Sequence, residues 1–282
     1  MSAPYRDEFR TVNGCRLHFQ DWGDLDAPVL LMVHGLSQQS HTFDAVAERL
    51  QARFRCIALD VRGRGESDWA DPKTYNHRTY MDDILGLMQA LDVPRWHYMG
   101  TSMGGQIAMM AAAKRPGVFT SVVFNDIGPE LDPRGGARIT QYMQTVPASF
   151  PDFDAALDWA IAQYPWLQGV PRDAVAGSVR WAVREADDGT WRFRFDPAII
   201  QNAPADPAML KKAAAIMWQG LEALRGPVLL VRGVDTDVLH ADTAARMAQV
   251  QPRLTQVDVP GIGHAPTLAE PVVLEALDTF YA

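Results

Sequence analysis

Apolar and polar residues follow two different patterns along the chain. In residues 10–21 they alternate on either side of Asn13-Gly14, a dipeptide typical of a two-residue hairpin turn. Further along, short runs are apolar throughout, which favours strands that are buried on both faces. These runs are residues 29–33, 56–59, 122–124 and 228–231. The pattern predicts an antiparallel hairpin followed by strands in the interior of a sheet.

Helical patterns separate the apolar runs. They cover residues 41–50, 80–91 and 103–114, and the last of them is followed by Pro116 and Gly117, which end helices. Because strands and helices alternate, we expect a mostly parallel sheet with helices on both faces. The predicted fold class is α/β.

The alternation stops between residues 128 and 219. This segment is dense in Pro, Trp and Phe, and it contains no run that resembles a core strand. A second hairpin is expected within it at residues 181–195, turning at Asp188-Gly189, with one apolar and one polar face. We therefore expect a core formed by residues 1–127 and 220–282, with residues 128–219 inserted as a cap.

Composition and charge favour a folded protein that acts on small molecules. A chain of 282 residues with 48% hydrophobic residues can bury the core of one large domain that carries an insertion. The net charge of −8 offers no attraction to nucleic acid or to an anionic membrane surface, so small neutral or mildly polar molecules are the expected partners. Cys15 and Cys56 are expected to be buried thiols, since two cysteines do not form a disulfide framework.

The sequence shows neither a membrane span nor a secretory signal. No apolar run reaches the length of a membrane span, and residues 1–10 lack the apolar segment of a secretory signal. We therefore expect a soluble, cytoplasmic protein. The sequence pattern predicts no particular oligomeric state.

The candidate chemistry begins where the strand-like residues 94–98 meet the helix at residues 103–114. Here Gly100-Thr-Ser102-Met-Gly104 fits Gly-x-Ser-x-Gly, in which a serine occupies a sharp turn from strand to helix. The two glycines allow neighbouring backbone to approach closely. The motif predicts that Ser102 is an exposed nucleophile.

A serine hydroxyl needs a base to take its proton and an acid to orient that base. His264 is the candidate base, because it lies in a glycine-rich turn between the strand-like residues 254–259 and the last helix. Asp237 is the favoured acid, because it follows an apolar run. Asp235 and Asp126 remain alternatives for that role.

Attack on an ester carbonyl also requires N–H groups that stabilise the oxyanion. Met103 N–H qualifies because it follows the nucleophile at the start of a helix. Leu36 N–H, in the loop after residues 29–33, is expected to be the second donor. His34 in the same loop is expected to brace the loop rather than to act as a second base.

Five short motifs follow one another along the chain. They are His34-Gly35-Leu36, the segment Asp-Val-Arg-Gly-Arg-Gly-Glu-Ser at 60–67, Gly-Thr-Ser-Met-Gly-Gly at 100–105, Arg-Gly-Val-Asp-Thr-Asp at 232–237, and Gly-His-Ala-Pro at 263–266. Together they resemble the α/β-hydrolase superfamily in its capped, cofactor-free branch, whose nucleophile, acid and histidine follow one another in this order. The resemblance covers the chain outside the cap. It implies an acyl-enzyme mechanism with Ser102 as nucleophile, His264 as base and then acid, and Asp237 as the orienting group.

The resemblance leaves several reactions open. Hydrolysis of carboxylic esters is the expected activity, and hydrolysis of lactones, perhydrolysis or cleavage of a C–C bond are alternatives of the same family. Thr101 and Ala265 stand where C–C hydrolases usually carry Asn and Trp, which disfavours C–C cleavage. A hydrolase-like receptor with little turnover is the alternative outside the enzymes. No metal or cofactor is expected, because hydrolysis by a triad needs neither and no ligand motif occurs in the sequence.

The predicted cap bears on the substrate. It contains Trp159, Trp166, Trp181 and Trp191. An aromatic lid above a serine suits a small to medium, apolar or aromatic acyl group. The competing interpretation is that these rings hold the cap together, since a small lobe must bury large side chains to stay folded.

Overall fold

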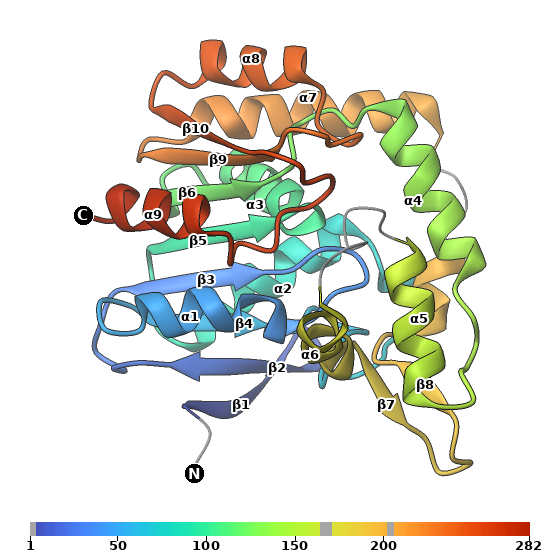
Figure 1. The fold of residues 1–282 in the computed structure, drawn as a ribbon. Helices are drawn as coiled ribbons and strands as arrows, with labels where there is room; N and C mark the ends of the chain where they lie inside the picture. Colours follow the sequence, from blue (N-terminus) through green and yellow to red (C-terminus); the bar gives the residue numbers. More distant parts are fainter. Residues whose placement is uncertain (1–3, 164–170, 202–205) are drawn as a thin grey trace.

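The structure is a computed structural model that describes residues 4–163, 171–201 and 206–282. Within these residues, an eight-stranded sheet runs through the molecule in the order β1-β2-β4-β3-β5-β6-β9-β10 (Figure 1). Its strands are β1 (Tyr5–Val12), β2 (Cys15–Trp22), β3 (Val29–Val33), β4 (Arg55–Leu59), β5 (Trp96–Thr101), β6 (Phe119–Asn125), β9 (Val228–Gly233) and β10 (Leu254–Val259). β2 pairs antiparallel with β1 and β4, and the other pairs are parallel. The predicted α/β fold with a mostly parallel sheet is confirmed.

The predicted first hairpin is confirmed as well. Val12 pairs with Cys15 across the turn. The two turn residues, Asn13 and Gly14, have φ values of 48° and 74°. Positive φ at both central positions is the conformation that Asn-Gly favours in such turns.

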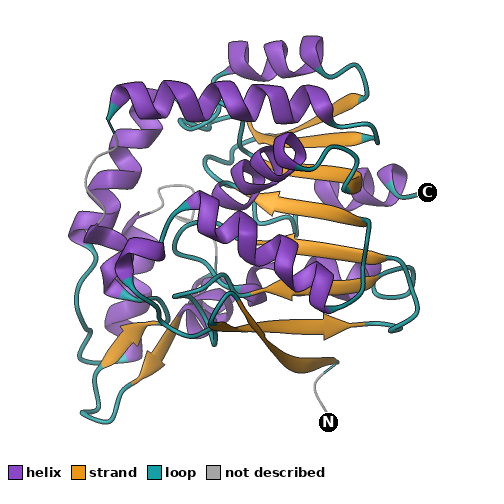
Figure 2. Ribbon diagram, turned by 180° about the vertical axis from the view of Figure 1, so that it is seen from behind, coloured by secondary structure: helices purple, strands orange, loops and turns teal. Residues whose placement is uncertain are grey.

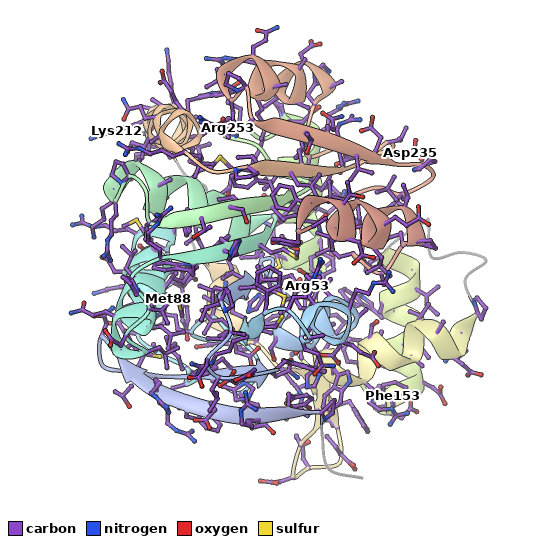
Figure 3. All side chains as sticks on the ribbon, turned by 90° about the vertical axis from the view of Figure 1, so that its left-hand side faces the viewer. Arg53, Met88, Phe153, Lys212, Asp235 and Arg253 are labelled. Carbon is purple, nitrogen blue, oxygen red and sulfur yellow. The ribbon has the colours of Figure 1, made fainter. Side chains whose placement is uncertain are left out.

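Helices cover both faces of the sheet (Figures 1 and 2). α1 and α9 lie on one face, and α2, α3, α7 and α8 lie on the other, each set over its own cluster of buried side chains. Their bounds are α1 (Asp44–Leu50), α2 (His77–Ala90), α3 (Met103–Lys114), α7 (Pro207–Ala223), α8 (Ala241–Val250) and α9 (Pro271–Phe280). Figure 3 shows side chains filling the space between these layers, among them the fully buried Met88 of α2. The predicted helix at residues 41–50 is a 3-10 turn, Ser40–Phe43, that continues into α1.

Between β6 and β9 the chain leaves the sheet at the carboxyl ends of its parallel strands (Figure 1). It forms α4 (Pro133–Thr145), α5 (Phe153–Gln163), α6 (Arg172–Ala182), β7 (Val183–Glu185), β8 (Trp191–Phe193), the 3-10 turn Pro197–Gln201 and then α7. The predicted second hairpin is present but shorter, since residue 181 still belongs to α6. Its Gly189 has the positive φ, 76°, that the predicted turn requires.

The segment from α4 to β8 has a small apolar cluster of its own. The division of the chain into a core and a cap remains a prediction, and its predicted end at residue 219 falls inside α7. That helix lies directly against α3, because a Cβ atom on Gly220 would stand 1.7 Å from the backbone oxygen of Met109. The second half of α7 therefore packs with the layers of the sheet.

Candidate active site

Ser102 occupies the predicted sharp turn between β5 and α3. Its φ of 50° and ψ of −114° are unusual for a residue with a side chain. The turn brings backbone segments very close together, since a Cβ on Gly100 would lie 2.5 Å from the carbonyl carbon of Gly104, and one on Gly104 would lie 2.1 Å from the oxygen of Val33. Glycine at these two positions is therefore what allows Ser102 to stand at the end of the strand.

His264 lies between Ser102 and Asp126. Its Nε2 is 2.9 Å from Ser102 Oγ, and its Nδ1 is 2.8 Å from Asp126 Oδ2. Because an ionised carboxylate can only accept hydrogen bonds, Nδ1 carries the proton and Nε2 is left to accept the one from the serine hydroxyl. This tautomer is the one that a general base beside a serine requires.

Asp126 is fully buried and holds its place through several donors. It directly follows β6, with a φ of 54°. Its Oδ1 accepts from Gly233 N–H at 3.0 Å, and its Oδ2 accepts from Thr236 Oγ1 at 2.6 Å as well as from His264. Three hydrogen bonds offset the cost of removing a carboxylate from water. They also tie the loop after β9 to the residue that orients the imidazole.

His264 Nδ1 bonds to Asp126 and not to Asp237, although Asp237 is close enough to interact electrostatically with His264. The prediction that Asp237 orients the imidazole is therefore wrong for this geometry. Its two carboxylate oxygens accept from Nε and Nη2 of Arg138, on α4, at 2.5 and 2.8 Å. Hydrogen bonds from that guanidinium hold the pKa of Asp237 below its usual range. The loop after β9 instead reaches the site with Thr236, which bonds to Asp126.

The other two candidate acids, Asp235 and Asp126, lie in different surroundings. Asp235 is exposed in the loop after β9 (Figure 3). Asp126, the remaining alternative from the sequence, has the contact with His264. A position after a strand could not distinguish Asp126 from Asp237, because β6 and β9 end at the same edge of the sheet. The choice depends on which loop approaches His264 in three dimensions.

The two predicted oxyanion donors lie beside the nucleophile. Met103 is the first residue of α3, and the first N–H groups of a helix have no partner within it. Leu36 belongs to the loop after β3, which comes close to the elbow, since a Cβ on Gly35 would be 3.6 Å from Ser102 Cβ. The placement suits the oxyanion role, and that role remains a prediction for both residues.

His34 braces this loop, as predicted. Val61 N–H donates to its Nε2 at 3.1 Å, so Nδ1 carries the proton and donates to the backbone oxygen of Gly35 at 2.6 Å. Burial lowers the pKa of His34 to about 4. Both ring nitrogens are thus engaged by backbone groups, and the ring is neutral at pH 7.

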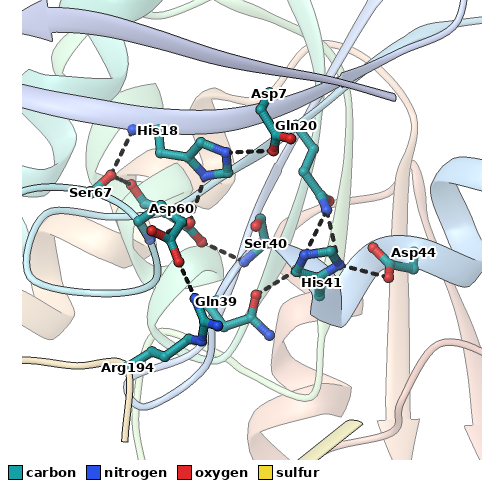
Figure 4. A network of polar contacts seen from close by, with 11 residues as sticks. Asp7, His18, Gln20, Gln39, Ser40, His41, Asp44, Asp60, Ser67 and Arg194 are labelled. Carbon is teal, nitrogen blue, oxygen red and sulfur yellow. Dashed lines mark hydrogen bonds and ion pairs between the residues drawn. The ribbon is translucent and has the colours of Figure 1, made fainter. Parts of the chain in front are cut away.

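A second polar network holds the loops after β3 and β4 against β2 (Figure 4). At its centre the buried Asp60 accepts from Ser40 N–H at 2.6 Å, from Glu66 N–H at 2.9 Å and from Nδ1 of His18 at 2.7 Å. Burial alone would lower the pKa of His18, but hydrogen bonds and charges of Asp60 and Asp7 outweigh burial and raise it. The contact between the buried His18 and Asp60 side chains therefore helps to fix the loop on which Leu36 lies.

The tryptophans of the predicted cap have different surroundings. Trp159 and Trp191 pack against other aromatic rings of that segment, including Phe150 and Phe153, as expected if they hold it together. Trp181 stacks on His41, which lies just before α1, with ring centroids 3.5 Å apart and planes at 12°. Trp166 lies outside the described residues.

Within the described ranges 4–163, 171–201 and 206–282, no three His, Cys, Asp or Glu side chains are grouped so that they could hold a metal ion. Among the helices described, none is long and apolar enough to cross a membrane. Cys15 and Cys56 are both buried as free thiols, in agreement with the prediction.

Comparisons with known proteins place this geometry in a family. A family model described as alpha/beta hydrolase fold matches residues 28–271. The chain is 32% identical over 272 residues to a 3-hydroxybutyrate-oligomer hydrolase of Cupriavidus necator, covering 94% of this chain and 92% of the relative. It is 29% identical to a 2-(acetamidomethylene)succinate hydrolase of Mesorhizobium japonicum, covering 90% of this chain and 87% of that one.

Solved structures agree with the sequence relatives. The crystal structure of an alpha/beta hydrolase from Novosphingobium aromaticivorans superposes with a TM-score of 0.89 at 31% identity, covering 99% of both chains. The five motifs, the strand order and these matches lead to the same assignment. The chain belongs to the α/β-hydrolase family.

Proposed function

We propose that this protein is a serine hydrolase that cleaves carboxylic esters through an acyl-enzyme. Ser102 is the nucleophile, His264 the general base and then acid, and Asp126 the group that orients the imidazole. The observation that carries the proposal is the position of His264, 2.9 Å from Ser102 Oγ and 2.8 Å from Asp126 Oδ2. A buried acid, a histidine and a serine in this sequence of contacts are the parts of a catalytic triad.

The reaction follows from these contacts. Ser102 Oγ attacks the ester carbonyl carbon while its proton passes to His264 Nε2, and the carbonyl oxygen becomes an oxyanion facing the N–H groups of Met103 and Leu36. Collapse breaks the bond to the alcohol, which leaves with the proton from Nε2. A water molecule then attacks the acyl-enzyme by the same route and releases the acid. Asp126 remains ionised and stabilises the imidazolium in both halves.

The relatives suggest which esters to test. A relative matched over 94% of this chain is named for hydrolysis of 3-hydroxybutyrate oligomers, which are linear esters of a small hydroxy acid. We therefore propose short esters of small acyl groups, hydroxy-acid oligomers among them, as the substrate class. Lactone and C–C hydrolysis would use the same three residues, and among the residues that the structure describes no contact in the site favours either over ester cleavage.

The test is ester hydrolysis by the wild type and by Ser102→Ala, with p-nitrophenyl acetate, p-nitrophenyl butyrate and the linear dimer and trimer of 3-hydroxybutyrate. Loss of the nucleophile should lower kcat by about 10³-fold or more. Ser121→Ala is a matched control, because Ser121 also contacts a histidine, Nδ1 of His97 at 2.8 Å, near the start of β6. That variant should keep wild-type kcat.

A serine-directed fluorophosphonate separates the enzyme from the receptor-like alternative. The wild type should be labelled at Ser102, and mass spectrometry of the digested protein identifies the modified residue. Absence of ester turnover together with absence of labelling at Ser102 would contradict the proposed function.

A further inference from the structure

Asn125, the last residue of β6, bonds to the segments that carry Ser102 and His264. It is buried, and its Nδ2 donates to Thr101 Oγ1 at 3.1 Å and to the backbone oxygen of Pro266 at 2.9 Å. Its own backbone oxygen accepts from Ser102 N–H at 3.0 Å. The next residue in the chain is Asp126. The side chain thus links the nucleophile turn to the histidine loop, and the backbone joins the same residue to Ser102 and to the acid.

The chemistry of the partners fixes the orientation of this amide. The backbone oxygen of Pro266 can only accept, so the NH₂ group of Asn125 must face it. Both N–H bonds of that group are then used, one toward each loop. Pro266 lies two residues after His264, so the bond to Pro266 holds the short segment that carries the base.

The amide of Asn125 also destabilises the folded state in one respect. The Oδ1 atom of Asn125 is buried and has no hydrogen-bond partner among the described residues. A buried polar atom without a partner destabilises the folded state, whereas an apolar side chain of the same shape would avoid this cost. The amide is therefore better explained by what its two N–H bonds hold together.

We propose that Asn125 is a positioning residue that sets the distance between Ser102 Oγ and His264 Nε2. The inference rests on the proposed function. Ser102 and His264 lie on loops that are 162 residues apart in the chain, and Asn125 donates one hydrogen bond to each side of that gap. A displacement of about 1 Å between reacting groups can cost about 100-fold in rate.

The main variant is Asn125→Leu, which keeps the branched shape and removes both N–H donors. Its readout is the second-order rate at which a fluorophosphonate labels Ser102, together with kcat and KM for p-nitrophenyl butyrate. Labelling and kcat should each fall between about 10-fold and 100-fold, while KM changes little, because the ester still binds but meets a displaced base.

The chain offers a matched control in Gln251→Met. Gln251 is also a buried amide whose NH₂ group donates to two backbone oxygens, those of Leu221 and Leu224, at 2.9 and 3.0 Å. It lies near the start of β10, at the end of the sheet opposite the site. This variant should unfold at a lower temperature than the wild type and yet label Ser102 at the wild-type rate. Loss of a buried amide is thereby separated from loss of positioning.

Thr101→Val tests which bond matters. It removes the acceptor on the serine side and leaves the bond from Asn125 to Pro266, so its labelling rate should exceed that of Asn125→Leu. If Asn125→Leu does not fold, Asn125→Asp takes its place, since an ionised carboxylate of the same shape donates neither bond.

The inference is overturned if the substituted Asn125 protein labels Ser102 within twofold of the wild type, or if Gln251→Met slows labelling as much as the Asn125 variant does. These outcomes differ from failure of the proposed function, in which the wild type itself is not labelled at Ser102.

Discussion

Ser102 and Asp126 share a backbone feature, because each has a positive φ, 50° and 54°, directly after a parallel strand. Residues with side chains adopt this region at a cost of about 1–3 kcal/mol, and they do so mainly where the surrounding structure requires it. Here the sharp turns after β5 and β6 bring Ser102 and Asp126 to opposite sides of the His264 ring. The strain is thus located at the two residues on which the proposed chemistry depends.

Substitution of the acid tests the contact between Asp126 and His264 most directly. Asp126→Asn should lower kcat by about 10³- to 10⁴-fold with the fold intact, because it removes the charge that selects the imidazole tautomer and stabilises the imidazolium. Asp237→Asn is the matched control and should cost far less, since that carboxylate pairs with Arg138 instead. Steady-state kinetics with circular dichroism on both variants checks this. Equal losses in the two variants would show that the contact between Asp126 and His264 is not the functional one.

Most strands and helices could be predicted from local sequence patterns. The apolar run at 29–33 coincides with β3, because a continuous apolar run reports burial on both faces of a strand. The alanine-rich segment at 103–114 coincides with α3, since alanine favours helix, and the strand-like residues 254–259 coincide with β10. The contact between Asp126 and His264 was not readable in this way. Asp126 and Asp237 both follow parallel strands, and only the packing of the loop after β9, with Thr236 turned to the site, distinguishes them.

The loops after β3 and β4 depend on another element, β2, through the bond from His18 to Asp60. The raised pKa of His18 gives a pH dependence of stability with a definite sign. Its contribution is complete below the pKa of unfolded histidine, about 6.5, and is lost as the pH rises through the raised folded pKa. The free energy of unfolding of the wild type should therefore exceed that of His18→Gln by more at pH 6 than at pH 9.

Urea unfolding at the two pH values measures this difference, and His97→Gln provides a control of opposite sign. Burial lowers the pKa of His97, so protonation disfavours its folded form and the wild type should gain stability relative to that variant as the pH rises. If both variants responded to pH in the same direction, the contact between His18 and Asp60 would not be what stabilises the loops.

At the scale of the whole molecule, the proposed site lies where loops from four strands meet at one edge of the sheet. The loops after β3, β5, β6 and β10 carry Leu36, Ser102, Asp126 and His264. The carboxyl edge of a parallel sheet is the general location of sites in such folds, because successive loops converge there. The chain then passes through the predicted cap and returns along α7, so the placement of α7 decides how the cap segment rejoins these layers.

The close packing of α7 against α3 at Gly220 can be tested by substitution. Gly220→Ala places a methyl group 1.7 Å from the backbone oxygen of Met109, and a backbone atom cannot move aside as a flexible side chain can. The two helices must separate, which should lower the free energy of unfolding by about 1–3 kcal/mol. Gly177→Ala, in the interior of α6, is the matched control, since its methyl group would have nothing within 4 Å. It should raise the free energy of unfolding by about 0.5–1 kcal/mol through helix propensity. Denaturant unfolding measures both, and a Gly220→Ala protein as stable as the wild type would mean that α7 does not pack on α3 as described.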